Sequence, residues 1–148
     1  MIYAVAPTGS VRRTDVAAVL LLTNSGNLLL LQRANDKPFA GRWGLPCGKR
    51  EPNESLVEAA IRETREETGF HLRSSDLASC PSLLVGDERS HFLYQPYVTP
   101  LPFEMRPTLN PKEHSAYAWV TPRHALRHSL VEDGKDSFRR LFSHLRIL

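Results

Sequence analysis

The 148-residue chain lacks the features that mark several classes of protein. Its two cysteines, Cys47 and Cys80, form no Cys-x-x-Cys pair, so the sequence indicates neither a disulfide framework nor a zinc knuckle. Its longest apolar run, residues 16–22, is far shorter than the roughly 20 residues that span a bilayer, and residues 1–7 contain no basic segment followed by an apolar one. We therefore expect no membrane span, no secretory signal and a reducing, cytoplasmic setting.

Strong charge bias and repetition are also missing. Nineteen Lys and Arg residues against sixteen Asp and Glu residues give a formal net charge of +3, and the chain has no long basic tract. Both observations count against a nucleic-acid partner. We find no repeat of fixed period and no low-complexity tract. A chain of this length can bury a sizeable core, so we expect one domain over residues 1–148.

Apolar stretches and turn residues predict the elements of the first third of the chain. Residues 15–22 and 28–33 are apolar and flank turn residues at 23–27, which predicts a hairpin buried on both faces. Residues 35–49 contain three glycines and two prolines and are predicted to form a loop.

A helix is predicted between Ser55 and Gly69. Ser55 and Glu58 have the spacing of a capping box, and Gly69 supplies the stop signal. At 100° per residue, one arc of this helix can face a core. The residues on that arc are Leu56, Val57, Ala60, Ile61, Thr64 and Thr68.

The remainder predicts further strands and two short helices. Residues 83–85 and 91–98 predict a second hairpin, in which Pro96 favours an edge or bulged strand. Residues 100–111, with four prolines, are predicted to form a surface loop. Further elements are expected at 117–120 (strand), 122–128 (helix) and 136–145 (amphipathic helix). This mixed order predicts an α+β fold, an α/β/α sandwich with a mixed β-sheet between helices.

Three carboxylates are concentrated on the predicted helix. Glu63, Glu66 and Glu67 stand at positions i, i+3 and i+4, so they lie within about one turn of each other. Such a cluster is tolerated either on a solvated face or around a cation. Oxygen ligands favour Mg²⁺ or Mn²⁺ over zinc. Arg62 is positioned to pair with a neighbouring carboxylate and to fix its orientation.

The spacing in residues 48–70 resembles the Nudix box, whose pattern is G-x5-E-x7-R-E-U-x-E-E-x-G-U with U a bulky apolar residue. All seven fixed positions are met. They are Gly48, Glu54, Arg62, Glu63, Glu66, Glu67 and Gly69. Thr64 departs from the first U position, whereas Phe70 satisfies the second. The resemblance extends from about residue 15 to residue 120. It implies an α/β/α sandwich that hydrolyses a nucleoside diphosphate linked to another moiety, with a divalent metal.

The resemblance also implies roles for individual residues. Glu66 and Glu67 are the expected main metal ligands, and Glu63 is either a further ligand or the base that deprotonates the attacking water. Gly48 is expected to bring a backbone carbonyl close to the metal. Arg62, like Glu54, is expected to orient the cluster, so we include it in the catalytic set.

Residues outside the box extend the predicted site. In some Nudix enzymes the general base lies elsewhere, and Glu113, just before the strand at 117–120, is our preferred alternative. Asp87, Glu88 and Glu104 are the other candidates for this role. Arg33, at a strand end next to the loop that enters the box, is a candidate phosphate contact. His91, His114, His124 and His128 share no ligand spacing and are interpreted as surface or satisfied histidines rather than zinc ligands.

Three functional hypotheses follow. The first is a Mg²⁺-dependent hydrolase, with Mn²⁺ as a substitute, that cleaves the pyrophosphate linkage of a nucleoside triphosphate or of a nucleotide sugar or ADP-ribose type substrate. The second is removal of pyrophosphate from RNA 5′ ends. The third is a catalytically silent Nudix module that senses a nucleotide, although such modules would be expected to lose box carboxylates. An exposed edge strand permits a homodimer without requiring one.

Overall fold

The computed structural model describes residues 2–3, 14–87 and 89–148. Its elements, in chain order, are β1 (Ile2–Tyr3), β2 (Thr14–Thr23), β3 (Leu28–Arg33), β4 (Trp43–Gly44), β5 (Cys47–Lys49), α1 (Leu56–Thr68), the 3-10 helix η1 (Ser74–Asp76), β6 (Ala78–Ser79), β7 (Leu83–Gly86), β8 (His91–Leu101), β9 (His114–Val120), α2 (Pro122–Ala125) and α3 (Gly134–Leu145). In the described part of the chain the strands form one mixed sheet in the order β1-β7-β8-β2-β3-β4. Within it, β5 pairs with β2, β6 with β8, and β9 with β3.

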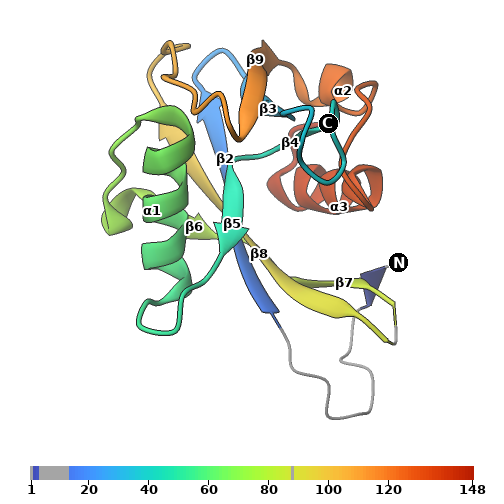
Figure 1. Cartoon of the computed structure of the whole chain (residues 1–148). Helices are drawn as coiled ribbons and strands as arrows, with labels where there is room; N and C mark the ends of the chain where they lie inside the picture. Colours follow the sequence, from blue (N-terminus) through green and yellow to red (C-terminus); the bar gives the residue numbers. More distant parts are fainter. Residues whose placement is uncertain (1, 4–13, 88) are drawn as a thin grey trace.

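The sheet lies between helices, as the sequence predicts. Figure 1 shows α1 on one side of the sheet and α2 and α3 on the other. Alternate residues of β2 divide between the two cores: Val19 packs in the cluster that includes Ala60 of α1, and Leu20 packs in the cluster that includes Phe142 of α3. The predicted α/β/α arrangement is therefore confirmed. Among the described residues, no helix has the length and apolar character needed to cross a membrane.

The predicted ends of α1 are confirmed. The Ser55 side chain accepts a hydrogen bond from Glu58 N, and the Glu58 side chain accepts one from Ser55 N, which completes the capping box. At the other end Gly69 has a φ of 79°, a left-handed conformation that glycine adopts without strain. These two caps fix where α1 begins and ends, and the packing of Ala59 and Ala60 in the core fixes which face turns inward.

Several predictions about the strands need correction. Residues 35–49 are not all loop, because Trp43–Gly44 and Cys47–Lys49 form β4 and β5. The predicted hairpin of β2 and β3 forms, but its register joins only Leu22 and Leu28; β2 runs mainly parallel to β8. The expectation that Pro96 marks an edge strand is wrong, since β8 lies inside the sheet. Its alternative, an irregular ladder, agrees with the pairing, because residues 80–82 stand opposite only Gln95 and Pro96.

The position of Pro96 explains why the sheet accepts it. Pro96 lies between the residues of β8 that pair with β7 and those that pair with β6. In that gap its carbonyl accepts hydrogen bonds from Cys80 N (3.0 Å) and from Gln95 Nε2 (3.0 Å). The missing N–H of the proline therefore falls where no ladder of β6 or β7 needs it.

Candidate active site

One cavity of about 380 Å³ gathers most of the predicted site residues. It is lined by Arg33, Cys47, Gly48, Lys49, Glu63, Glu66, Glu67, Asn110 and Glu113. The cavity thus combines the end of β3, the strand β5, the carboxylate face of α1 and the turn before β9. We refer to it as the carboxylate cavity.

Gly48 and Glu63 are in close contact. A Cβ atom placed on Gly48 would overlap the Glu63 carboxyl group. The glycine is therefore required by the approach of the glutamate, since any side chain at position 48 would displace that carboxylate from its present place. This contact links β5 to α1 and positions Glu63 at the floor of the cavity.

Arg62 donates hydrogen bonds to glutamates of the box, Glu54 and Glu63 among them. Its Nη2 donates to Glu54 Oε1 at 2.6 Å, its Nε donates to Glu54 Oε2 at 3.0 Å, and its Nη1 donates to Glu63 Oε1 at 2.8 Å. A further bond from Nη2 reaches Lys49 O at 3.0 Å. The hydrogen bonds from Arg62 lower the pKa of Glu54 to about 2. Arg62 is not among the residues that line the carboxylate cavity.

Glu67 is the buried member of the cluster. Its Oε2 accepts a hydrogen bond from Cys47 N at 3.0 Å, and only 8% of the residue is exposed. Burial, and after it the neighbouring Glu63 carboxylate, raise the pKa of Glu67 well above its ordinary value. Burial likewise raises the pKa of Glu63, against the opposing effect of Arg62. Two carboxylates that destabilise each other's ionised form make a site that favours positive charge.

The donor set fits a hard divalent cation. Glu63, Glu66 and Glu67 offer only oxygen atoms, and a cation among them would offset both the burial of Glu67 and the repulsion from Glu63. In residues 2–3, 14–87 and 89–148 no three acidic, His or Cys side chains lie close enough to form a preassembled metal cluster. The Glu63 carboxylate is turned to Arg62, and Glu66 is largely exposed. Binding a cation would therefore draw these side chains together.

The residues predicted outside the box differ in their positions. Arg33 and Glu113 line the carboxylate cavity; Arg33 Nε donates to Pro38 O at 2.6 Å, and Glu113 is 3.0 Å from Lys37 Nζ. Asp87 accepts backbone hydrogen bonds in its own turn. Glu104 accepts one from Asn27 Nδ2, and neither Asp87 nor Glu104 is among the residues that line the cavity. Glu88 lies outside the described residues.

Sequence reasoning missed His114. The expectation of a surface or satisfied histidine is wrong for this residue, which is 5% exposed and whose Nδ1 has no hydrogen-bond partner in the described part of the chain. Its Nε2 lies 3.9 Å from Glu67 Oε1. Burial lowers the pKa of His114 to about 4, so the imidazole is neutral at pH 7. Its place next to Glu113, at the start of a strand, is the sequence signal that could have found it.

A second, smaller cavity adjoins the first. It has a volume of about 140 Å³ and shares Arg33, Cys47 and Glu67 with the carboxylate cavity. The rest of its wall is mainly apolar and aromatic, and includes Leu45, Val85, Phe92, Tyr94 and Phe138. Burial raises the pKa of the Cys47 thiol to about 12, so this side chain is a neutral wall group rather than a nucleophile. We refer to this space as the apolar cavity.

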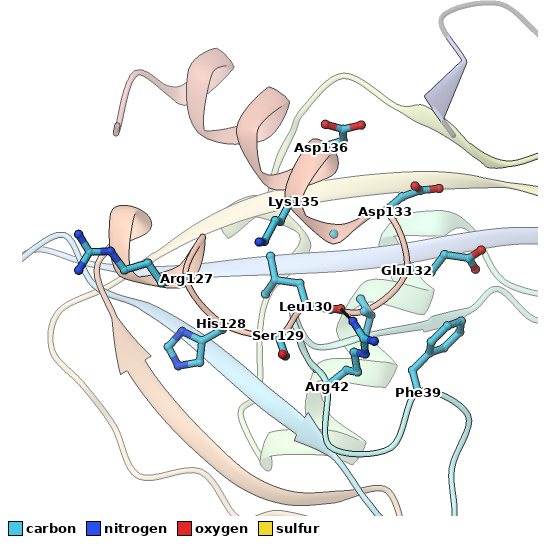
Figure 2. A pocket seen from close by; sticks show the side chains of 12 residues that line it. Phe39, Arg42, Arg127, His128, Ser129, Leu130, Glu132, Asp133, Lys135 and Asp136 are labelled. Carbon is cyan, nitrogen blue, oxygen red and sulfur yellow. Dashed lines mark hydrogen bonds between the residues drawn. The ribbon is translucent and has the colours of Figure 1, made fainter.

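A wider cavity of about 620 Å³ lies beside the start of α3 and is lined by side chains of both charges (Figure 2). In it Arg42 Nη1 donates to Leu130 O at 3.3 Å. Phe39 is half exposed, with a left-handed φ of 58°. It also lines a fourth cavity, of about 490 Å³, whose wall includes Arg33 and Cys47. Shared lining residues therefore make this cavity a neighbour of both the carboxylate cavity and the wider cavity beside α3.

Known proteins can be aligned with this chain over most of its length. The family model of the NUDIX domain matches residues 11–141. CTP pyrophosphohydrolase from Escherichia coli is 33% identical over 116 residues, which cover 78% of this chain and 81% of that protein. Nucleoside triphosphatase NudI from Escherichia coli strain UMN026 is 31% identical over 121 residues, which cover 74% of this chain and 84% of that protein.

Solved structures show the same fold. The solution structure of the Escherichia coli ORF135 protein superposes with a TM-score of 0.76 at 27% identity and covers 95% of this chain and 96% of that one. The crystal structure of a Caenorhabditis elegans Ap4A hydrolase binary complex gives a TM-score of 0.70 at 21% identity, over 90% of this chain and 98% of that one. The second likeness concerns the fold alone.

Proposed function

The chain belongs to the Nudix family, and from this membership we propose that it is a Mg²⁺-dependent hydrolase that cleaves the pyrophosphate linkage of a small nucleotide. Nudix hydrolases generally use divalent metals. One observation carries the proposal: Glu63, Glu66 and Glu67 border a single cavity together with the phosphate-binding candidate Arg33. Mn²⁺ would serve as a substitute, because it also prefers oxygen ligands.

Each residue of the site has a proposed role. Glu66 and Glu67 would hold the cation, with the backbone of Gly48 beside them and Glu63 as a third ligand or the general base. When bound, the cation supplies charge compensation for the pyrophosphate and activation of water. Arg62 keeps the Glu63 carboxylate in place through its 2.8 Å hydrogen bond. Arg33 would bind a phosphate oxygen of the substrate.

Two residues compete for the role of general base. Glu63 is held by Arg62 and packed on Gly48, so it is rigidly placed. Glu113 lines the same cavity but is paired with Lys37 at 3.0 Å and is 42% exposed in its side chain. The base must approach the attacking water closely, and a base accessible to bulk water loses part of its advantage. We therefore propose Glu63 as the base and Glu113 as the alternative.

The apolar cavity is the proposed site of the nucleobase. Its aromatic and aliphatic wall suits a planar nucleobase, and a base bound there would lie next to phosphates in the carboxylate cavity, because the two cavities share lining residues. Two relatives bear the names CTP pyrophosphohydrolase and nucleoside triphosphatase. We therefore propose a nucleoside triphosphate as substrate, with a nucleotide sugar or ADP-ribose type as the second class, whose larger leaving group would extend toward α3.

A substrate panel tests this proposal. Nucleoside triphosphates, ADP-ribose, nucleotide sugars, dinucleoside polyphosphates and a 5′-triphosphorylated RNA are incubated with Mg²⁺, with Mn²⁺ and with chelator, and the released phosphate, pyrophosphate and nucleoside monophosphate are measured. We expect metal-dependent release of pyrophosphate from one or more triphosphates. If only the RNA is turned over, the substrate is an RNA 5′ end and not a small nucleotide. Tight nucleotide binding without turnover of any compound would favour the silent sensing module.

The Glu63→Gln variant tests the proposed base. We expect kcat to fall by about 10² to 10⁴-fold, the usual contribution of a positioned general base. Glu58→Gln is the matched control, because it lies on the same helix and glutamine still completes the capping box. Wild-type kcat in Glu63→Gln, together with a large loss in Glu113→Gln, would transfer the role to Glu113.

A further inference from the structure

His114 occupies a buried position that packing alone does not explain. Its Nδ1 has no hydrogen-bond partner in the described part of the chain, although the residue is only 5% exposed. A buried polar atom without a partner is destabilising, and an apolar side chain of similar volume would fill the space without this cost. The other imidazole nitrogen, Nε2, faces Glu67 Oε1 at 3.9 Å. The reason for a histidine at this position must therefore be sought in the interaction of Nε2 with Glu67.

The two oxygens of Glu67 face different groups. Oε2 accepts a hydrogen bond from Cys47 N at 3.0 Å, so the backbone of β5 holds that side of the carboxylate. Oε1 faces His114 Nε2, about 1 Å beyond ordinary hydrogen-bond distance. A carboxylate fixed at one oxygen can still rotate about its side-chain torsions, whereas one held at both oxygens has a single orientation.

The backbone at His114 is firmly anchored. The N–H groups of Glu113 and His114 both donate to Asn110 O, at 3.0 and 2.9 Å, and Ala34 N donates to Glu113 O at 3.0 Å. His114 also pairs with Arg33 where the register of β3 and β9 shifts. The turn before β9 and the irregularity of the sheet together bring the imidazole under α1.

We propose that His114 is a positioning residue for Glu67: its Nε2 faces Oε1 at 3.9 Å, and when the carboxylate binds the divalent cation this distance closes to a hydrogen bond that, with Cys47 N on Oε2, fixes the carboxylate. The inference rests on the proposed function, because it requires Glu67 to be a metal ligand. His114 lies outside the Nudix box and borders the apolar cavity. In this role it acts on Glu67, the proposed metal ligand, and not on the substrate. Hydrogen bonds that orient a metal-binding side chain contribute about 10 to 100-fold to metal affinity.

Metal affinity without substrate provides the first test. Mn²⁺ is titrated into the full chain, and the free ion is measured by electron paramagnetic resonance. We expect His114→Leu to weaken Mn²⁺ binding by about 10 to 100-fold and His114→Gln, which retains a donor near the position of Nε2, to restore most of it. Thr64→Val, which removes another buried polar atom without a partner, is the matched control and should bind Mn²⁺ as the wild type does. Equal affinity of wild type and His114→Leu would overturn the inference.

Kinetics separate positioning from a general structural effect. In His114→Leu we expect the Mg²⁺ concentration for half-maximal rate to rise by the same factor as the Mn²⁺ dissociation constant, with KM for the nucleotide at saturating Mg²⁺ little changed. A rise in KM with an unchanged Mg²⁺ requirement would instead assign His114 to substrate binding and refute the proposal. If the wild type binds no Mn²⁺, both the proposed function and this inference fail. If it binds and hydrolyses normally but the variant does not differ, only the inference fails.

The wild-type protein offers a test that needs no variant. Long-range ¹H–¹⁵N correlation spectra distinguish the two neutral tautomers of an imidazole. The inference requires the proton of His114 to reside on Nε2, since a carboxylate oxygen accepts a hydrogen bond only from a protonated nitrogen. Observation of the Nδ1–H tautomer would overturn it, even if His114→Leu proved unable to fold.

Discussion

Thr64 occupies the middle of α1 with a hydroxyl that gains nothing from its position. The residue is fully buried, and its Oγ1 has no hydrogen-bond partner among the described residues. In the unfolded chain this hydroxyl is hydrated, so folding loses that interaction without replacing it. Valine has nearly the same shape, is also β-branched and has a similar helix propensity. Thr64→Val should therefore remove the penalty without creating a cavity.

The magnitude follows from the cost of an unsatisfied buried hydroxyl. We expect Thr64→Val to raise the free energy of unfolding by about 1 to 2 kcal/mol, the lower part of the range for such groups. For a chain of this size, about 2 to 4 °C of Tm corresponds to 1 kcal/mol, so Tm should rise by about 2 to 8 °C. Urea unfolding followed by tryptophan fluorescence and far-UV circular dichroism measures the effect, with an unchanged m value as the sign that only stability has moved.

Thr68 supplies a matched comparison one helical turn later. It is also buried, but its hydroxyl donates to Thr64 O at 2.6 Å and accepts from Phe70 N at 3.1 Å. Thr68→Val should lower the free energy of unfolding by about 1 to 3 kcal/mol, because it leaves the Phe70 N–H unpaired beneath the surface. The same substitution on the same helix face is thus expected to have opposite signs. A loss of stability in Thr64→Val, or equal effects at both sites, would refute the reasoning.

Two further predictions concern the carboxylate cluster. Gly48→Ala should push the Glu63 carboxylate aside and lower kcat by about 10²-fold. Tm should stay close to wild type, since the overlapping atoms belong to the end of a flexible side chain. A large fall in Tm with kcat retained per folded molecule would contradict this. The Arg62 hydrogen bonds hold the pKa of Glu54 at about 2, below its ordinary 4.5, so Glu54 stabilises the fold fully above pH 4.5 and loses this effect as the pH falls toward 2. Urea unfolding at a series of pH values should therefore show a shallower acid decline in Glu54→Gln, and parallel declines would exclude the effect.

Local sequence determined what could be predicted without a structure. The capping box, Gly69 and the spacing of Glu63, Glu66 and Glu67 depend on residues within one helix, so the periodicity of a helix was enough to place them on one face. For this reason the placement of the three glutamates on α1 could be predicted from the sequence.

Long-range pairing determined what the sequence could not show. Arg33 and Glu113 reach the carboxylate cavity because β3 pairs with β9, a contact between residues about 80 positions apart along the chain. The parallel pairing of β2 with β8 similarly turns the predicted edge strand into a central one. Propensity and periodicity describe single elements, and the choice of neighbours in a mixed sheet depends on how both faces are covered.

His114 shows how the two levels combine at one residue. In sequence it is one of several histidines without ligand spacing, and its chemistry becomes visible only when the register of β3 and β9 sets it against Glu67. The pairing that brings Arg33 and Glu113 to the cavity also delivers the imidazole to the opposite side of the carboxylate. A shift of one residue in that register would exchange the faces of Glu113 and His114 and would remove both contacts together. The irregularity between Gln32 and Arg33 is therefore part of the site, because it fixes which residue of β9 meets α1.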